Sequence, residues 1–295
     1  MTDRPFDPDA LARPALAPDP SLSRSEMETL QREIAAAATF SDDGPPTPAG
    51  VAVDDAPSLA DGLPPARDAR PTERAGDDGT GPGDAGPDAP VVVGVDQAFH
   101  TDRGDAPDAA VSAAVAFRGG DVIEYATATT PLSVPYVPGL LAFREGGPIL
   151  AALDELDAAP DLLVCDGSGR IHFREAGLAT HVGVVRDVPS VGVAKRLLCG
   201  EPDEPTGERP AGWRTPIRAD GSVTTAEPGT VIGHAVQSRQ YPNSRRVNPL
   251  YVSPGHRVAA GTAADLVAAL CAGYKLPEPT RVADAAAAAA KRDDP

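Results

Sequence analysis

The sequence predicts an α/β protein built on a mixed β-sheet flanked by helices. Two short apolar runs, VVVGVD at 91–96 and DLLVCDG at 161–167, are typical of strands that are buried on both faces. Between them, residues 109–117 and 121–130 are separated by RGG, which predicts two antiparallel strands joined by a tight turn. An antiparallel pair followed by alternating strands and helices indicates a sheet with both kinds of pairing.

The N-terminal segment 1–40 predicts a loose tail followed by a helix. Residues 1–20 are rich in Pro and Asp, and SLSRSEMETLQREIAAAATF then has a cap residue and glutamates in the order of a helix start. Ser23 or Ser25 is the expected cap. One face of the helix should carry an apolar stripe made of Leu22, Met27, Leu30 and Ile34.

Residues 41–90 differ in composition from the rest of the chain. They contain 10 Pro, 8 Gly and 11 acidic residues against 3 Arg, and their apolar residues are sparse and aperiodic. Such a segment buries too little apolar surface to offset the entropy lost on ordering. We therefore expect a disordered acidic insert that is rich in Pro and Gly.

The folded domain is expected over residues 91–284, with an Ala-rich tail at 285–295 that is helical if it is structured. Beyond the strands above, the patterns predict a helix at 146–157, a strand and then a helix within 181–198, strands at 230–238 and 249–256, and a helix at 262–273. Thr262 and Asp265 have the spacing of a capping box at the start of the last helix.

The chain is strongly acidic, with 43 acidic and 26 basic residues among 295 and a formal charge of -17. Only three of its bases are lysines. An acidic, Lys-poor, Ala-rich surface favours adaptation to high salt, while an ordinary acidic soluble protein is the alternative. The composition speaks to solubility and not to the fold.

Cysteine usage and hydropathy indicate a cytoplasmic protein with no membrane partner. The three cysteines, Cys165, Cys199 and Cys271, are widely spaced without a CxxC pair, which favours reduced thiols over a disulfide framework or a zinc site. There is no apolar run of membrane-spanning length, and the N-terminus lacks the pattern of a signal peptide.

Two aspartates stand at the ends of the predicted buried strands. Asp96 closes the first run and Asp166 closes the second, where side chains of an α/β sheet line the ligand crevice. If the strands are neighbours, the two residues lie about one strand spacing apart, roughly 5 Å at the backbone. Carboxylates that close repel each other unless a divalent cation is bound. A Mg²⁺ or Mn²⁺ site and a pair of turn-capping aspartates are both open at this point.

Glu145 is the candidate third ligand, because it stands at the start of the predicted helix 146–157. A glutamate in a first turn is also favoured by the helix dipole alone. Beside Asp96 and Asp166, however, it completes an oxygen-rich set of the kind that Mg²⁺ or Mn²⁺ takes.

Acidic residues are missing from two stretches, 228–264 and 167–174. These stretches and the motif GVAKRLL carry the bases Arg170, His172, Arg174, Lys195, Arg196, His234, Arg239, Arg245, Arg246, His256 and Arg257. Selective loss of acids on an acidic protein favours a phosphate-binding surface. The compact ammonium group of Lys195 is suited to a position near a phosphate. His256 is open to two readings, a general acid–base or phosphate contact, and a turn histidine with an ordinary hydrogen bond.

Six segments together resemble the endonuclease V family of deoxyinosine 3′ endonucleases. They stand in the family's order over about 91–284, with the helix near 22–40 fitting as well: VGVDQAF, PYVPGLLAFREG, DGSGRIHFREAGLATHVGV, SVGVAKRLLCG, NPLYVSPGHR and YKLPEPTRVAD. The chain departs from the family where HFRE replaces the common His-Pro-Arg, where REGGP has an extra glycine, and in the insert at 41–90.

The resemblance implies an RNase H-like fold, a need for Mg²⁺ with Mn²⁺ as a substitute, and a role in DNA repair. The implied reaction is hydrolysis of the second phosphodiester bond on the 3′ side of deoxyinosine, leaving a 5′-phosphate and a 3′-hydroxyl. DNA containing deoxyinosine is the implied partner of a monomeric protein, and RNA containing inosine is the alternative substrate.

Carried over motif by motif, the resemblance assigns roles to individual residues. Asp96, Glu145 and Asp166 match the metal-binding carboxylates, Lys195 the lysine beside the scissile phosphate and His256 the active-site histidine. The strand-separating wedge is matched by Pro135, Tyr136, Val137 and Pro138. Backbone groups that read the displaced base are expected around Gly139, Leu140, Leu141, Gly167 and Gly169.

Two other classes of protein fit parts of the pattern less well. An ATP-binding phosphotransferase of the actin-like type would need a Gly-rich phosphate loop after the strand that ends at Asp96, and VDQAFHTDRG offers none close by. A nucleic-acid-binding module without catalysis would not need the three carboxylates, Lys195 and His256 together.

Overall fold

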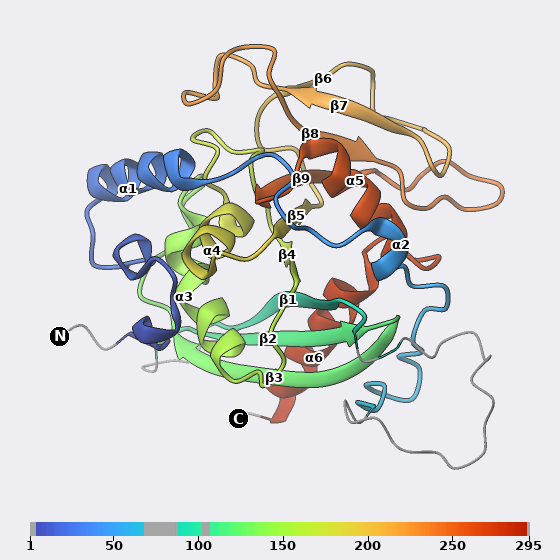
Figure 1. Ribbon diagram of the computed structural model, residues 1–295, viewed down its shortest axis with the longest axis horizontal. Coiled ribbons are helices and arrows are strands. Elements are labelled where there is room, and N and C mark those ends of the chain that lie inside the picture. The colour runs from blue at the N-terminus through green and yellow to red at the C-terminus, as the bar shows by residue number, and fades with distance from the viewer. Residues whose placement is uncertain (1–3, 68–85, 87, 102–106, 294–295) are drawn as a thin grey trace.

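The computed structural model describes residues 4–67, 86, 88–101 and 107–293, and these build a nine-stranded sheet with helices on both faces (Figure 1). The sheet order is β3-β2-β1-β4-β5-β9-β8-β7-β6. The strands are β1 (Val91–His100), β2 (Ala109–Arg118), β3 (Asp121–Pro131), β4 (Leu162–Asp166), β5 (Ser190–Ala194), β6 (Glu201–Pro202), β7 (Arg214–Arg218), β8 (Val231–Val236) and β9 (Leu250–His256). The predicted α/β class with a mixed sheet is confirmed.

The centre of the sheet is parallel and its flanks are antiparallel. Strands β1, β4 and β5 run in the same direction, and Val95 of β1 lies opposite Cys165 of β4. The predicted hairpin of β2 and β3 extends one side, and β9, β8, β7 and β6 extend the other side in antiparallel pairing. The pairing of β1 with β4 stops at Val95 and Cys165, so Asp96, one residue further along β1, and Asp166, the last residue of β4, lie at the same edge of the sheet. The strand predicted to end at Asp96 continues to His100 in its pairing with β2.

Helices cover the two faces with two separate hydrophobic cores. On one face lie α1 (Arg24–Ala37), α3 (Leu141–Asp154) and α4 (Leu178–Arg186), with the short 3-10 turns Pro8–Ala10 and Pro14–Leu16. The other face carries α2 (Pro48–Val51), α5 (Ala260–Ala269) and α6 (Glu278–Asp293) (Figure 1). None of the described helices is long and apolar enough to cross a membrane.

Helix α6 packs directly against β1 because β1 carries a glycine at the contact. A Cβ atom on Gly94 would lie 2.2 Å from the carbonyl carbon of Pro279, far inside van der Waals contact. The absence of a side chain lets the helix backbone rest on the strand. This close approach brings the next turns of α6 toward the carboxyl end of β1.

Helix α1 forms as the sequence predicts, with Ser23 as its cap. The Ser23 side chain accepts a hydrogen bond from the Glu26 amide, and the Glu26 carboxylate accepts one from the Ser23 amide, so that both members of the capping box are present. Met27 and Ile34 from the predicted apolar stripe are buried. The Ala-rich C-terminal segment is also helical, but α6 continues through residue 285 and buries Ala286 and Ala287, so it is part of the domain.

Three local predictions were wrong for identifiable reasons. Helix α3 begins at Leu141 and contains Pro148 in its interior, whereas proline and two glycines in the sequence suggested a later start. Between 178 and 194 the order is helix α4 and then strand β5, and not a strand followed by a helix. The helix was missed because it is buried along its length, so that its sequence has no amphipathic period. Helix α5 has no side-chain cap of its own: Asp42 accepts hydrogen bonds from the Ala259 amide and the Thr262 hydroxyl.

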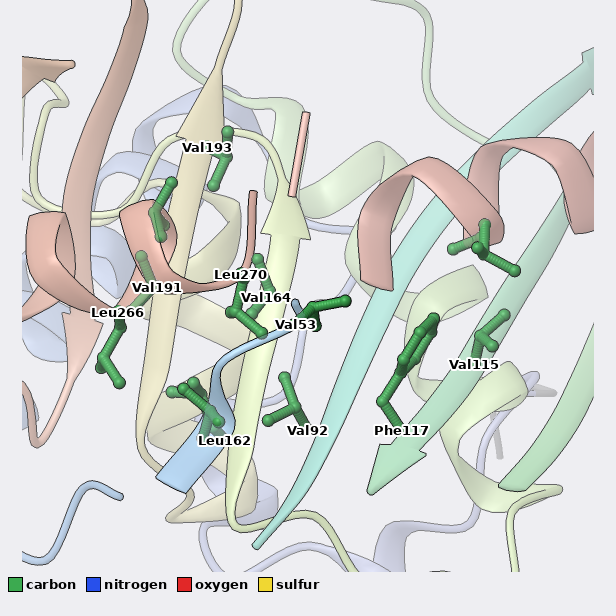
Figure 2. Close-up of a cluster of buried hydrophobic side chains, with 14 of the residues drawn as sticks. Val53, Val92, Val115, Phe117, Leu162, Val164, Val191, Val193, Leu266 and Leu270 are labelled. Carbon is green, nitrogen blue, oxygen red and sulfur yellow. The ribbon is translucent and has the colours of Figure 1, made fainter. Parts of the chain in front are cut away.

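The expected disorder of residues 41–90 is not found in residues 41–67. Val51 and Val53 are buried in the core between α5 and the sheet, where Figure 2 shows Val53 beside Val92 and Val164. The Val53 amide also donates to the Ala269 carbonyl. Two well-placed valines and backbone hydrogen bonds anchor a Pro-rich segment that has little regular structure. Residues 68–85 and 87 of the same segment lie outside the described part of the chain.

Candidate active site at the carboxyl ends of β1 and β4

A cleft of about 590 Å³ opens where β4 and β5 end and where β1 parts from β4. Its lining includes four carboxylates and one lysine, contributed by five elements of the fold: Asp96, Glu145, Asp166, Lys195 and Asp284. The parallel pairing of the three strands explains why their ends meet here. Four of these five residues are ones that the sequence singled out.

Asp96 has one satisfied and one unsatisfied carboxylate oxygen. Its Oδ1 accepts a hydrogen bond of 2.7 Å from the Gln97 amide, while its Oδ2 is buried and has no hydrogen-bond partner among the described residues. Burial, together with the charge of Asp166, raises the pKa of Asp96 to about 8. A buried carboxylate without a partner is costly, so this oxygen is suited to receive a proton or a cation.

Asp166 and Lys195 form an ion pair across the ends of β4 and β5. The Lys195 ammonium donates to Asp166 Oδ2 at 2.7 Å. Burial acts to lower the pKa of Lys195, but the hydrogen bond and the charge of Asp166 outweigh it, and the pKa is raised. Lys195 therefore stays charged next to the carboxylates, and half of its side chain remains exposed to the cleft.

Glu145 reaches the cleft from the second turn of α3, and not from its first turn as the sequence suggested. The helix-dipole explanation for an acid at this place therefore falls away. Burial raises the pKa of Glu145 to about 7, against the opposing charge of Arg144. Asp166 adds to the increase.

Asp284 is the site residue that the sequence reasoning missed. It lies on α6, lines the same cleft, and its charge contributes to the raised pKa values of both Asp96 and Lys195. The only signal was its place at the end of the motif YKLPEPTRVAD. Its position depends on the contact between Gly94 and Pro279, which no local pattern reveals.

The carboxylates have the chemistry of a site for a hard divalent cation. All four offer oxygen ligands, and the partnerless Asp96 Oδ2 marks where positive charge is lacking. They do not form a closed cage, because within the described ranges no three His, Cys, Asp or Glu side chains stand close enough together to hold a metal ion as they are. The residues present fit such an ion in type and in charge.

The Pro-bracketed loop before α3 forms the rim of the cleft. Tyr136 is 67% exposed at its tip, and Tyr136, Val137 and Pro138 line the cleft, while Pro135 does not. Of the five residues expected at the base pocket, the cleft is lined by Gly139, Leu141 and Gly167.

Two residues of the expected base pocket lie elsewhere. Leu140 points into a small core with Met27 and Phe143. Gly169 packs against the backbone of β9, where a Cβ atom would lie 2.2 Å from the Pro254 carbonyl oxygen. Both are therefore residues that support the pocket wall and do not line it.

His256 is not brought to the cleft. Strand β9 runs antiparallel to β5, so its carboxyl end lies beside Ser190, at the opposite end of β5 from Lys195. The imidazole is 1% exposed; its Nδ1 accepts a hydrogen bond from the Thr39 amide, and its Nε2 pairs with Asp187 at 3.1 Å. Of the two readings of the sequence, the geometry supports the histidine with an ordinary structural role.

The basic residues of the acid-free stretch 228–264 lie in two separate places. Arg257 is held by Asp43 and Asp187 near His256, far along β9 from the cleft. The loop between β8 and β9 instead contributes to a group that we call the aromatic-basic surface, made of Arg239, Tyr241, Tyr274, Lys275 and Arg281. The Arg239 guanidinium lies over the rings of both tyrosines, and Ser238 donates to the Lys275 carbonyl.

The aromatic-basic surface lies at the same edge of the sheet as the cleft. Val236, where its loop begins, pairs with Leu250, and Tyr251 pairs with Ala194, the residue before Lys195. The charge of Lys195 contributes to a lowered pKa of Lys275, after the larger effect of burial. Tyr241 and Tyr274 are 52% and 45% exposed.

Comparison with known proteins identifies the family of the chain. Residues 83–285 match the model of the Endonuclease V family. An endonuclease V from Natronomonas pharaonis, a halophilic archaeon, is 57% identical over 93% of this chain and 94% of its own, in agreement with the salt-adapted composition.

Two solved structures share the fold. An endonuclease V from Streptomyces avermitilis has a TM-score of 0.66 and 33% identity, covering 92% of this chain and 94% of its own. An endonuclease V from Ciona intestinalis, in complex with a 24-mer DNA containing an inosine followed by a ribo-adenosine, has a TM-score of 0.63 and 22% identity, covering 92% and 98%. The predicted RNase H-like architecture is thereby confirmed, and the chain belongs to the endonuclease V family of nucleases.

Proposed function

We propose that the protein is a metal-dependent endonuclease of DNA repair that recognises deoxyinosine. It hydrolyses the second phosphodiester bond on the 3′ side of the lesion and leaves a 5′-phosphate and a 3′-hydroxyl. The observation that carries the proposal is the partnerless, buried carboxylate oxygen of Asp96, in a cleft that it shares with Asp166, Glu145 and Lys195. The Ciona relative, solved with inosine-containing DNA, supports the choice of substrate.

Asp96, Asp166 and Glu145 would hold Mg²⁺, or Mn²⁺ in its place, and Asp284 stands ready as a further oxygen ligand. A bound divalent ion supplies Lewis-acid activation of water and charge stabilisation at the phosphate. Lys195 contributes a fixed positive charge beside the carboxylates, because Asp166 holds its ammonium in place. In the cleft that ammonium would face a bound phosphate and offset the negative charge that develops on it.

The rim of the cleft is suited to hold a displaced base. Tyr136 offers an exposed ring between Pro135 and Pro138, and a rigid aromatic side chain can fill the gap that a flipped nucleotide leaves in a duplex. Behind it, Gly139, Leu141 and Gly167 line the cleft. Backbone donors and acceptors can read the edge of hypoxanthine without any charged side chain.

The aromatic-basic surface gives the nucleic acid a second region of contact at the same sheet edge. Exposed tyrosine rings can stack with bases, and Arg239, which lies over both rings, can neutralise a phosphate, whereas Arg281 is held by Glu278. At high salt the contribution of charge is screened, so that stacking on Tyr241 and Tyr274 gains in relative importance.

We place this enzyme in the cytoplasm as a monomer, in keeping with its three free thiols.

The test uses matched duplexes that differ at one base. Deoxyinosine-containing DNA, the same DNA with adenine, and an RNA strand with inosine are each incubated with the protein in Mg²⁺ or in EDTA. We expect cleavage of the deoxyinosine strand in Mg²⁺ only. A protein that binds these strands but cuts none of them would instead be a binding module, and faster cleavage of the RNA would make it a ribonuclease.

A further inference from the structure

Helix α1 carries a fully buried side-chain amide, that of Gln31, which contacts the rim of the cleft at Gly139. Gln31 has no exposed surface, although it belongs to an N-terminal helix outside residues 83–285 that match the family model. Its Nε2 donates to the Gly139 carbonyl at 2.8 Å, and its Oε1 accepts from Arg174 Nε at 2.6 Å. Both ends of the amide are thus used, on two segments far from α1 in sequence.

The Gly139 carbonyl also has a second donor. His172 Nε2 lies 3.1 Å from it, while His172 Nδ1 accepts the Arg174 amide at 3.2 Å, which assigns the ring proton to Nε2. Burial, with the charge of Arg174, lowers the pKa of His172 to about 4, so the ring stays neutral and keeps that tautomer. The carbonyl of Gly139 is therefore held by one donor from α1 and one from the segment after β4.

This carbonyl is a natural point from which to fix the rim. Gly139 has a φ of +80°, and a Cβ atom there would lie 3.1 Å from the Phe173 ring, so the residue at this bend has to be glycine. Without a side chain of its own, the bend depends on hydrogen bonds to its backbone. On one side of it stand Tyr136 and Val137, and on the other stands Leu141, all of which line the cleft.

Simple docking of α1 does not require a buried amide. Met27 of α1 already packs on Leu140 and Phe143, and Ile34 is fully buried, so apolar contacts anchor the helix. A buried polar group is costly unless its hydrogen bonds are made, and an apolar side chain would serve docking alone. The amide of Gln31 is instead explained by its hydrogen bonds with the Gly139 carbonyl and with Arg174.

We propose that Gln31 is a positioning residue for base recognition: through the Gly139 carbonyl it sets the rim loop at 136–141 against the cleft. Helix α1 is then a part of the recognition apparatus and not only a cover on the domain. The inference rests on the proposed function, because the rim loop is the part of the site that would read hypoxanthine.

The test compares affinity for two duplexes, one with deoxyinosine and one with adenine at the same position, measured by fluorescence anisotropy in EDTA. The readout is the dissociation constant of the adenine duplex divided by that of the deoxyinosine duplex, a ratio that exceeds one when deoxyinosine is preferred. Gln31→Glu keeps the size of the side chain and the acceptor for Arg174 but turns the donor to Gly139 into an oxygen. Gln31→Met removes both hydrogen bonds. We expect each variant to lower the ratio by about tenfold, because both lose the hydrogen bond to the Gly139 carbonyl and one buried hydrogen bond has an effect of that size.

A matched control separates positioning from docking. Ile34→Val shortens a fully buried side chain on the same helix, away from the Gly139 contact, and should lower Tm while leaving the ratio unchanged. A wild-type preference for deoxyinosine that survives in both Gln31 variants overturns this inference alone. A wild-type protein without any preference overturns the proposed function, and this inference with it.

Discussion

Asp96 and Asp166 stand on neighbouring parallel strands, each one residue beyond the last pair of those strands, which is formed by Val95 and Cys165. Like charges held this close in a partly buried cleft each oppose the ionisation of the other. The sheet itself thus creates the excess of negative charge that a divalent cation would remove. Several properties of the protein should depend on that excess.

Removing the charge of Asp96 should stabilise the protein while it inactivates the enzyme. In Asp96→Asn without metal, we expect the free energy of unfolding at pH 8 to rise by about 1 kcal/mol or more, which is about 2–4 °C in Tm at this size. Calorimetry in EDTA measures it. The control is Asp157→Asn, which changes an exposed aspartate away from the cleft. A lower Tm in Asp96→Asn would show that this carboxylate is not strained by its surroundings.

The stability of the metal-free protein should fall as pH rises. The folded pKa values of about 8 for Asp96 and about 7 for Glu145 lie above the unfolded ones, so the folded state holds more protons in between. The resulting contribution to stability is present below about pH 4 and is lost as pH rises to about 8. Denaturant titrations at pH 5 and pH 8 in EDTA test this. Mg²⁺ should recover the loss at pH 8, whereas equal stability at both pH values would contradict the assignment.

The exposed ring of Tyr136 should contribute to selectivity and little to stability. For Tyr136→Ala we expect a Tm within about 2 °C of wild type, since a side chain that is 67% exposed has few contacts to lose. Discrimination between deoxyinosine and adenine should fall by about tenfold or more. Tyr241→Ala, on the aromatic-basic surface, should weaken binding to both duplexes equally. An unchanged preference in Tyr136→Ala would remove the wedge role.

Contact between α6 and β1 should be required for both folding and activity. In Gly94→Ala the added Cβ meets the Pro279 backbone, which can yield only if the helix moves. Overpacking of this kind costs about 1–3 kcal/mol, and it would also shift Asp284 away from the cleft. Gly221→Ala is the control, because a Cβ there meets nothing within 4 Å. Full activity and full stability in Gly94→Ala would contradict this close packing of α6 on β1.

His256 should matter for stability and not for catalysis. In His256→Ala the Thr39 amide and Asp187 each lose a buried partner, which should cost about 1–3 kcal/mol of unfolding free energy. The kcat of the folded protein should remain near that of wild type. Loss of kcat at unchanged Tm would return His256 to the active site.

The sequence predicted those features that the residue types within a single short segment determine. Continuous apolar runs marked β1 and β4 as interior strands, so Asp96 and Asp166 were expected at one edge on the condition that the two strands are neighbours, and the sheet order meets that condition. Lys195 was found in the same way, because it follows directly on a strand-like run in a chain with only three lysines.

What the sequence could not predict depends on contacts between distant segments. The direction of β9 decides that His256 is remote, and a motif read in one dimension contains no direction. Asp284 joins the site only because Gly94 admits α6. Val53 orders part of an insert whose composition indicates disorder, and Gln31 reaches the rim over more than a hundred residues of sequence.

The position of the cut is the sharpest test of the proposed endonuclease activity. An end-labelled duplex with one deoxyinosine is digested in Mg²⁺ by the wild-type protein and by Asp96→Asn, and the products are mapped at nucleotide resolution. We predict one product, cut at the second phosphodiester on the 3′ side of deoxyinosine, with a 5′-phosphate and a 3′-hydroxyl, and none with Asp96→Asn. Equal cutting of the adenine duplex, or activity retained in Asp96→Asn, would contradict the account.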